Sequence, residues 1–146
     1  MSTNVHPTDK PITPERFNEA SEGNHHGWLG FDVSHVAEGT ITATLTVRPD
    51  HLNPGQGLHG GVAASFADSL CGYGVFTALP NDAEGFTTVE LSANYLGKAA
   101  DGDQLTGHAV LRRGGRQVQV WDVEITSEDR LVAIARLTQL IRYPKP

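Results

Sequence analysis

The chain has 146 residues, the usual size of one domain with one hydrophobic core. Its 11 lysine and arginine residues against 17 aspartate and glutamate residues give a formal net charge of -6, so it lacks the broad basic surface that binds nucleic acid or anionic lipid. The only cysteine, Cys71, excludes an intrachain disulfide and the disulfide-stabilised class of secreted domains. We therefore expect a soluble, cytoplasmic protein with no nucleic-acid or membrane partner.

Membrane and metal sites are also not indicated. No run approaches the roughly 20 apolar residues that span a bilayer, and the first residues lack the apolar stretch of a secretory signal. The seven histidines include no group with the spacing of metal ligands, so we expect no metal. The 16 glycines and eight prolines indicate many turns and a sheet-rich fold.

The N-terminal residues 1–12 are polar and contain Pro7 and Pro11, which predicts a flexible lead-in before a single domain over residues 13–146. A short helix is predicted over residues 14–20. Thr13 is a suitable N-cap for this helix, and Pro14 fits its first position.

Six strands are predicted from alternating apolar and polar residues. The clearest covers residues 40–47, in which four apolar side chains alternate with four threonines. The others cover residues 31–36, 87–96, 104–112, 117–126 and 131–141, and most are joined by turns of hairpin length. In the strand over 117–126 the apolar parity shifts at Trp121, which predicts a bulge or a stretch covered on both faces.

One long helix is predicted over residues 60–77, between the second and third strands. Apolar residues cover a broad arc of this helix, and only Gly61, Ser65, Asp68 and Gly72 share the remaining narrow side. Gly72 and Gly74 each lower helix propensity by about 1 kcal/mol, so we expect a close approach of backbone or of another chain there. The order ββαββββ predicts an α+β fold in which one antiparallel sheet packs against this helix.

Residues 51–68 carry the features that point to chemistry. They combine a glycine-rich loop, the sequence His59-Gly60-Gly61 and a single charged side chain in the helix, Asp68. Free backbone N–H groups at a helix start stabilise a developing oxyanion, and a carboxylate in an apolar helix needs water or a partner. The same residues also fit a tight turn, a structural histidine and an aspartate that only pairs with a neighbour, and the pattern alone leaves both interpretations open.

These residues carry a resemblance to a known family. Asn53, His59-Gly60-Gly61 and Asp68, followed by GFTTVELSANYL and RRGGRQVQVWDVEI, resemble the hot-dog-fold acyl-CoA thioesterases, nearest to the PaaI-type branch and the related hydroxybenzoyl-CoA thioesterases. The resemblance covers about residues 27–142. It implies a six-stranded sheet wrapped around a central helix, and hydrolysis of aryl- or medium-chain acyl-CoA to free acid and CoA. It implies no cofactor, because CoA is part of the substrate.

The resemblance also implies a role for each matching residue. The Gly60 N–H would hold the oxyanion, and Asp68 would act as a nucleophile or as a general base on water. Asn53 would contact the thioester or orient the water, which Thr88 of a second subunit would help to hold, and His59 would fix the loop. Since a thioester is already activated, a carboxylate, an oxyanion donor and a positioned water suffice for its hydrolysis.

Coenzyme A carries phosphates, so an acidic protein must supply local positive charge for it. Arg112, Arg113 and Arg116 flank a Gly-Gly turn, and Lys98 follows a strand end, which makes them candidate CoA ligands. The alternative interpretation of these basic residues is a solvated hairpin tip.

Gly61, at the start of the long helix, is a further candidate for substrate binding. With no side chain, it would keep this side of the helix open to the substrate.

The resemblance further implies a homodimer joined edge to edge, with active sites at the boundary and with Asp68 and Thr88 supplied by different chains. Such dimers often pair into homotetramers. A non-catalytic acyl-CoA sensor on the same fold is the main alternative function. The joint presence of Asn53, Gly60, Asp68 and Thr88 favours the enzyme. A hot-dog dehydratase would need a catalytic histidine with a different acidic spacing, which the chain lacks.

Overall fold

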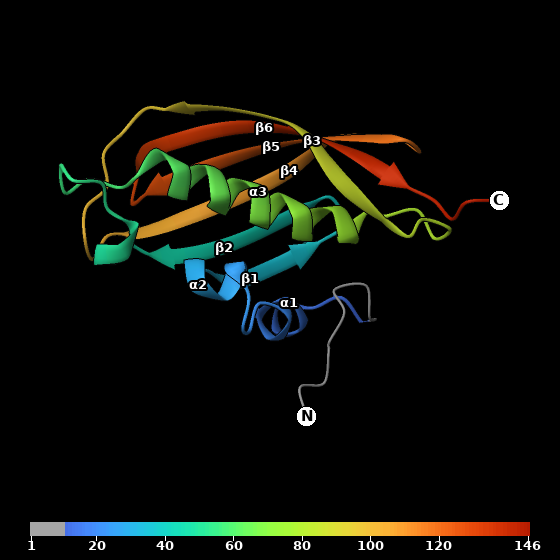
Figure 1. Cartoon of the computed structure of the whole chain (residues 1–146), viewed down its shortest axis with the longest axis horizontal. Coiled ribbons are helices and arrows are strands. Elements are labelled where there is room, and N and C mark those ends of the chain that lie inside the picture. Colours follow the sequence, from blue (N-terminus) through green and yellow to red (C-terminus); the bar gives the residue numbers. More distant parts are fainter. Residues whose placement is uncertain (1–10) are drawn as a thin grey trace.

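The structure is a computed structural model that describes residues 11–146. The predicted lead-in therefore lies almost entirely outside the described residues. Six strands form one sheet in the order β1-β2-β4-β5-β6-β3, and every neighbouring pair is antiparallel (Figure 1). The strands are β1 (Asp32–Ala37), β2 (Thr40–Thr46), β3 (Gly85–Tyr95), β4 (Gln104–Gly114), β5 (Val118–Ser127) and β6 (Arg130–Arg142). The predicted strands and the predicted α+β class are confirmed.

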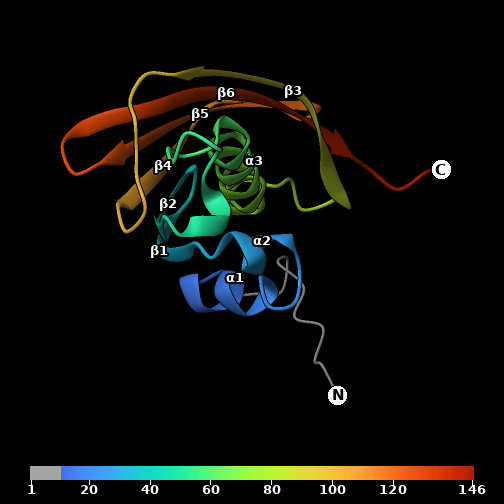
Figure 2. The same ribbon diagram turned by 60° about the vertical axis from the view of Figure 1, so that its left-hand side comes forward.

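The long helix α3 (Gly60–Thr77) has the predicted bounds. It lies on one face of the sheet, which curves around it (Figure 2). Five consecutive residues from Cys71 to Val75 are all buried, so this stretch of the helix is enclosed on every side. None of the described helices is both long and apolar enough to span a bilayer.

The two glycines inside α3 lie under aromatic rings. A Cβ atom on Gly74 would lie 2.9 Å from Cζ3 of Trp121, and one on Gly72 would lie 3.2 Å from Cζ of Phe86. A close approach does occur at both glycines, but the predicted approach of backbone or of another chain is wrong, because the groups that approach are aromatic side chains of β5 and β3 of the same chain.

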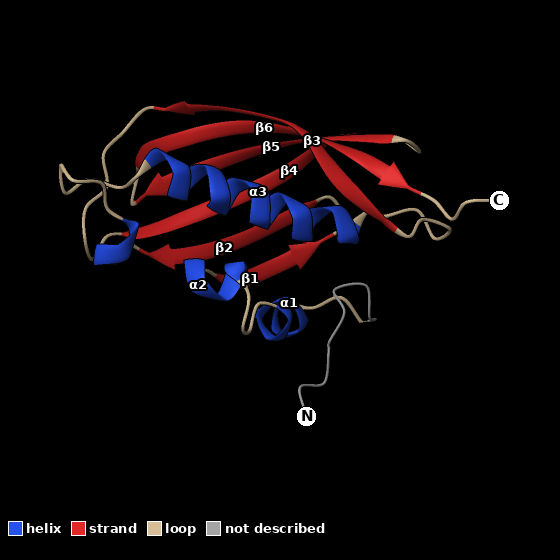
Figure 3. Ribbon diagram, viewed as in Figure 1, coloured by secondary structure: helices blue, strands red, loops and turns tan. Residues whose placement is uncertain are grey.

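Three short helical segments lie outside the sheet and α3. The predicted helix α1 (Pro14–Ala20) is capped by Thr13, whose Oγ1 accepts a hydrogen bond from the Arg16 N–H. A second helix, α2 (His25–Leu29), and the 3-10 turn η1 (Pro49–His51) were not predicted, because segments this short show no periodicity. α1 packs against β1 and α2 packs against α3 (Figure 3).

The predicted bulge in β5 is wrong. Burial alternates without interruption along this strand, because Gln119 occupies a core-facing position before Trp121. The Gln119 amide is satisfied there, since its Nε2 donates to the Ala78 carbonyl and its Oε1 accepts from the Trp121 indole, each at 2.9 Å. The register shifts lie instead in the two neighbouring strands, where Arg112 of β4 and Val132 of β6 are the bulged residues. A satisfied buried glutamine therefore produced the apparent parity shift.

Candidate active site

The loop before α3 is organised by Asn53. Its Oδ1 accepts hydrogen bonds from the N–H groups of Gly55 (2.8 Å) and Gly57 (3.4 Å), and its own N–H donates to the Gly57 carbonyl. The loop is anchored to the fold by the Leu58 N–H, which donates to the Ala99 carbonyl. The Asn53 oxygen is thus engaged within the loop.

His59 is the N-cap of α3. Its Nδ1 accepts a hydrogen bond of 2.8 Å from the Gly61 N–H, which satisfies one of the donors that a helix start leaves free. A Cβ atom on Gly61 would lie 2.8 Å from the same Nδ1. Glycine at position 61 therefore permits the histidine cap, and the Gly61 N–H is occupied by it.

The Gly60 N–H is the free donor at this helix start. Among residues 11–146 it has no hydrogen-bond partner, whereas the Val62 N–H donates to the His59 carbonyl. The Tyr95 ring lies over Gly60, because a Cβ atom there would lie 3.2 Å from its Cζ. A free N–H at the positive end of an 18-residue helix is suited to bind an oxyanion.

Asp68 lies further along α3 and is half-buried. Its Oδ1 accepts a hydrogen bond of 2.9 Å from Oγ1 of Thr88 on β3. Both residues belong to one chain, so the expectation that they come from different chains is wrong. The reason is that α3 packs against β3 of its own sheet.

Gln139 on β6 is a neighbour of this pair that the sequence did not reveal. It faces Thr88 in the β3–β6 register, and its Oε1 lies 2.8 Å from the Thr88 hydroxyl. The available signal was a glutamine at the core-facing position between Leu137 and Ile141, where alternation predicts an apolar residue.

Gly60 and Asp68 cannot act on one thioester from within one chain. They are eight residues apart on the same helix, and a rise of 1.5 Å per residue separates them by about 12 Å. An oxyanion donor and a catalytic carboxylate must each lie about 3 Å from the reacting group. One chain therefore carries two separate candidate half-sites.

The basic residues predicted to bind CoA do not gather in one place. Lys98 precedes β4, whereas Arg112, Arg113 and Arg116 lie at or beyond its far end, so the two groups are at opposite ends of the sheet (Figure 1). Arg116 forms a two-pronged ion pair with Asp82, at 2.7 and 3.2 Å. Only Lys98 lies beside the loop before α3, where it lines a hollow of about 230 Å³ together with Gly55, Gln56, Gly57 and Arg130.

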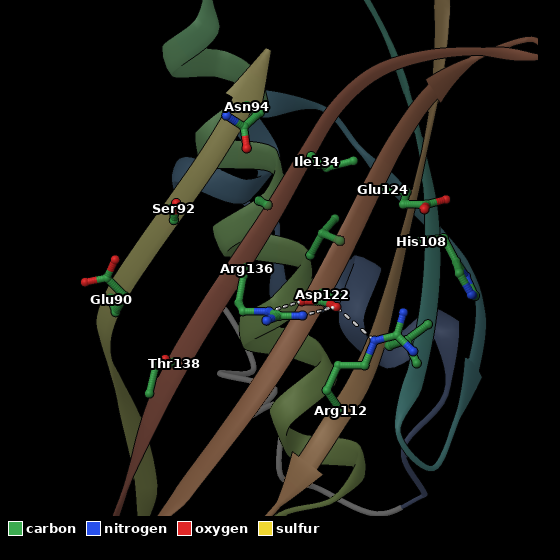
Figure 4. A pocket seen from close by; sticks show the side chains of 13 residues that line it. Glu90, Ser92, Asn94, His108, Arg112, Asp122, Glu124, Ile134, Arg136 and Thr138 are labelled. Atoms are coloured by element: carbon green, nitrogen blue, oxygen red, sulfur yellow. Dashed lines mark hydrogen bonds and ion pairs between the residues drawn. The ribbon is translucent and has the colours of Figure 1, made fainter. Parts of the chain in front are cut away.

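A groove of about 590 Å³ crosses the sheet face that is turned away from α3 (Figure 4). At its centre Asp122 accepts hydrogen bonds from Arg136 and Arg112, and these bonds lower the pKa of Asp122. The groove also contains Glu90 and Glu124, so its two arginines face three carboxylates and it has no excess positive charge. Neither Asp68 nor Gly60 lines it, which separates Arg112 from both half-sites.

Comparison with known proteins places the chain in a family. The thioesterase superfamily matches residues 55–134. The 1,4-dihydroxy-2-naphthoyl-CoA hydrolase of Escherichia coli is 31% identical over 90% of this chain and 96% of its own length. The acyl-coenzyme A thioesterase PaaI of the same organism is 32% identical over 74% of this chain and 75% of its own. The crystal structure of a thioesterase from Haemophilus influenzae superposes with a TM-score of 0.84 at 27% identity, covering 92% of this chain and 93% of that one. This chain therefore belongs to the thioesterase superfamily, and it is a thioester hydrolase with the hot-dog fold.

Proposed function

We propose that this protein hydrolyses aryl- or medium-chain acyl-CoA thioesters, with Asp68 as the catalytic carboxylate and the Gly60 N–H as the oxyanion donor. The observation that carries this proposal is the pair of half-sites on α3: a free N–H at the helix start and a half-buried carboxylate held by Thr88. The CoA thioester substrate is supported by the names of the two Escherichia coli relatives.

The chemistry needs only these groups and water. Either Asp68 removes a proton from water as the oxygen adds to the thioester carbonyl, or its carboxylate adds directly to form an anhydride that water then hydrolyses. In both routes the carbonyl oxygen becomes an oxyanion at the Gly60 N–H, the C–S bond breaks and CoA leaves as a thiolate. Asn53 supplies its Nδ2 as a donor toward the substrate, since its Oδ1 is engaged in the loop.

Each complete site takes Gly60 from one chain and Asp68 from a second copy. The edge strand β3 supports this assembly, because Val89 and Leu91 on it are exposed apolar residues and such edges need cover. β3 carries Thr88, next to Asp68, and Tyr95, over Gly60. Antiparallel pairing of two β3 strands, with Thr88 of one copy near Tyr95 of the other, brings the complementary half-sites together.

Of the residues predicted to bind a CoA phosphate, Lys98 is the best placed, since it lies beside the loop before α3. Arg112, Arg113 and Arg116 lie at the other end of β4. Pairing of dimers into a homotetramer stays a prediction.

The test is an assay of acyl- and aroyl-CoA esters with a thiol-reactive dye, comparing the wild-type chain with Asp68→Asn. The shape of the side chain is nearly preserved and its charge is removed, so turnover should fall about 10²- to 10⁴-fold while substrate binding remains. The matched control is Asp101→Asn at an exposed turn, which should leave turnover unchanged. Equal rates for Asp68→Asn and wild type would remove Asp68 from the mechanism.

A further inference from the structure

The Thr88 hydroxyl lies between two acceptors. Its Oγ1 is 2.9 Å from Oδ1 of Asp68 and 2.8 Å from Oε1 of Gln139. A hydroxyl carries one hydrogen and can donate only one hydrogen bond. If Thr88 donates to Asp68, the group that Gln139 turns toward Thr88 must itself be a donor.

The Gln139 amide has the donor that this arrangement needs. The side chain is fully buried, and among the described residues its Nε2 is a buried polar atom with no hydrogen-bond partner. Buried donors of this kind are nearly always satisfied. Turning the amide by 180° points Nε2 at the Thr88 oxygen, so that Gln139 donates to Thr88 and Thr88 donates to Asp68.

The same rotation also improves the contact of the Gln139 amide with Cys71. After the rotation Oε1 takes the place of Nε2 near the buried Cys71 thiol. Burial raises the pKa of Cys71, although the neighbouring Gln139 side chain acts in the opposite direction. The thiol therefore keeps its proton at neutral pH and can serve as a weak donor to Oε1.

We propose that Gln139 and Thr88 form a one-directional chain of hydrogen bonds that fixes the orientation of the Asp68 carboxylate, and that Gln139 is a positioning residue for hydrolysis. The proposal rests on the proposed function, in which Asp68 is the catalytic group. Thr88 occupies Oδ1 from the side of the sheet, which leaves Oδ2 for water or for the thioester. Gln139 acts only through Thr88, because it lies one strand further from the carboxylate.

The test compares kcat and KM of Thr88→Val, Thr88→Ser and Gln139→Met in the full-length chain. Thr88→Val should lower kcat about ten- to a hundredfold with KM nearly unchanged, as expected for the loss of one hydrogen bond to a charged group. Thr88→Ser keeps the hydroxyl and should retain most of kcat. Gln139→Met should lower kcat about three- to tenfold, and the double variant Thr88→Val/Gln139→Met should be no slower than Thr88→Val alone.

The matched control is Gln119→Met. Gln119 is also fully buried and faces Gln139 in the β5–β6 register, but it bonds to Trp121 and Ala78 rather than to the site. Its replacement should reduce stability and leave kcat unchanged. If Gln139→Met does not fold, Gln139→Leu provides the same measurement.

Three results separate the possible failures. A folded Gln139 variant with wild-type kcat would overturn the positioning role. If Gln139→Met lowers kcat by the same factor in an Asp68→Asn background as in the wild-type chain, the positioning role is overturned as well, because the effect would not pass through the carboxylate. Full activity of Asp68→Asn alone would instead overturn the proposed function on which this inference rests.

Discussion

The Gly60 N–H and the Asp68 carboxylate lie on the same helix, about 12 Å apart along its axis. The first is free for an oxyanion, and the second is held by Thr88. Both groups border β3, the edge strand of the sheet. A second copy joined at that edge is the simplest way to bring an oxyanion donor and a carboxylate onto one thioester.

Proline at position 60 would remove the proposed oxyanion donor, the Gly60 N–H, at a position where a helix tolerates proline. Gly60 is the first residue of α3, where proline is well tolerated, and His59 before it has φ -69° and ψ 131°, which suits a residue that precedes proline. Gly60→Pro should lower kcat about 10²- to 10³-fold, the usual effect of losing one oxyanion donor. Gly60→Ala is the matched control, since it keeps the N–H and makes the same contact with the exposed Tyr95 ring. Similar rates for the two variants would exclude this N–H as the donor.

The histidine cap should contribute to stability. His59→Ala removes the acceptor of the Gly61 N–H and should lower the free energy of unfolding by about 1 kcal/mol, as loss of an N-cap does. Gly61→Ala should also destabilise, because its Cβ atom would lie 2.8 Å from the His59 ring. Urea unfolding measures both effects. His35→Ala, at an exposed position of β1, should change little, and an equal loss there would show that the cap is not the cause.

The sequence predicted α3 well because its start and its length are local properties. A histidine and two glycines mark its first turn, and its bounds agree with the structure. The sequence could not show that Thr88 reaches Asp68 of its own chain, since this contact depends on how β3 packs on α3. Gln139 was missed for a related reason: a polar residue in a core-facing position has meaning only once its neighbours are known.

The β3 edge should hold the two copies together. Leu91→Lys places a charge on an exposed apolar position of this strand, and desolvating that charge opposes strand pairing. Sedimentation should then show a monomer, with activity lost in parallel. Leu131→Lys is the control, because Leu131 is similarly exposed but lies at the start of β6. A dimer that persists in Leu91→Lys and remains fully active would place the interface elsewhere.

Acid should weaken the fold partly through Asp122. Hydrogen bonds from Arg136 and Arg112 hold the pKa of this carboxyl below its ordinary value of 3.8. The folded state thus binds this proton less tightly than the unfolded state, so the contribution to stability is complete above pH 3.8 and is lost as the pH falls through the lower folded pKa. Chemical unfolding at pH values between about 4 and 2 should show a shallower loss of stability for Asp122→Asn than for wild type. If the free energy of unfolding falls with the same slope in Asp122→Asn and wild type, the Asp122 ion pairs contribute nothing to acid stability. The control is Asp101→Asn at an exposed position, which should match wild type.

In the dimer that we propose, each active site combines Gly60 of one chain with Asp68 of another. The most direct test is to refold two inactive variants together, Gly60→Pro and Asp68→Asn, in equal amounts, and to measure CoA release. Random pairing makes half of the dimers mixed, and each mixed dimer has one intact site, so about one quarter of wild-type activity should return. Activity that stays at the level of the separate variants, in a sample shown to contain mixed dimers, would contradict a shared site.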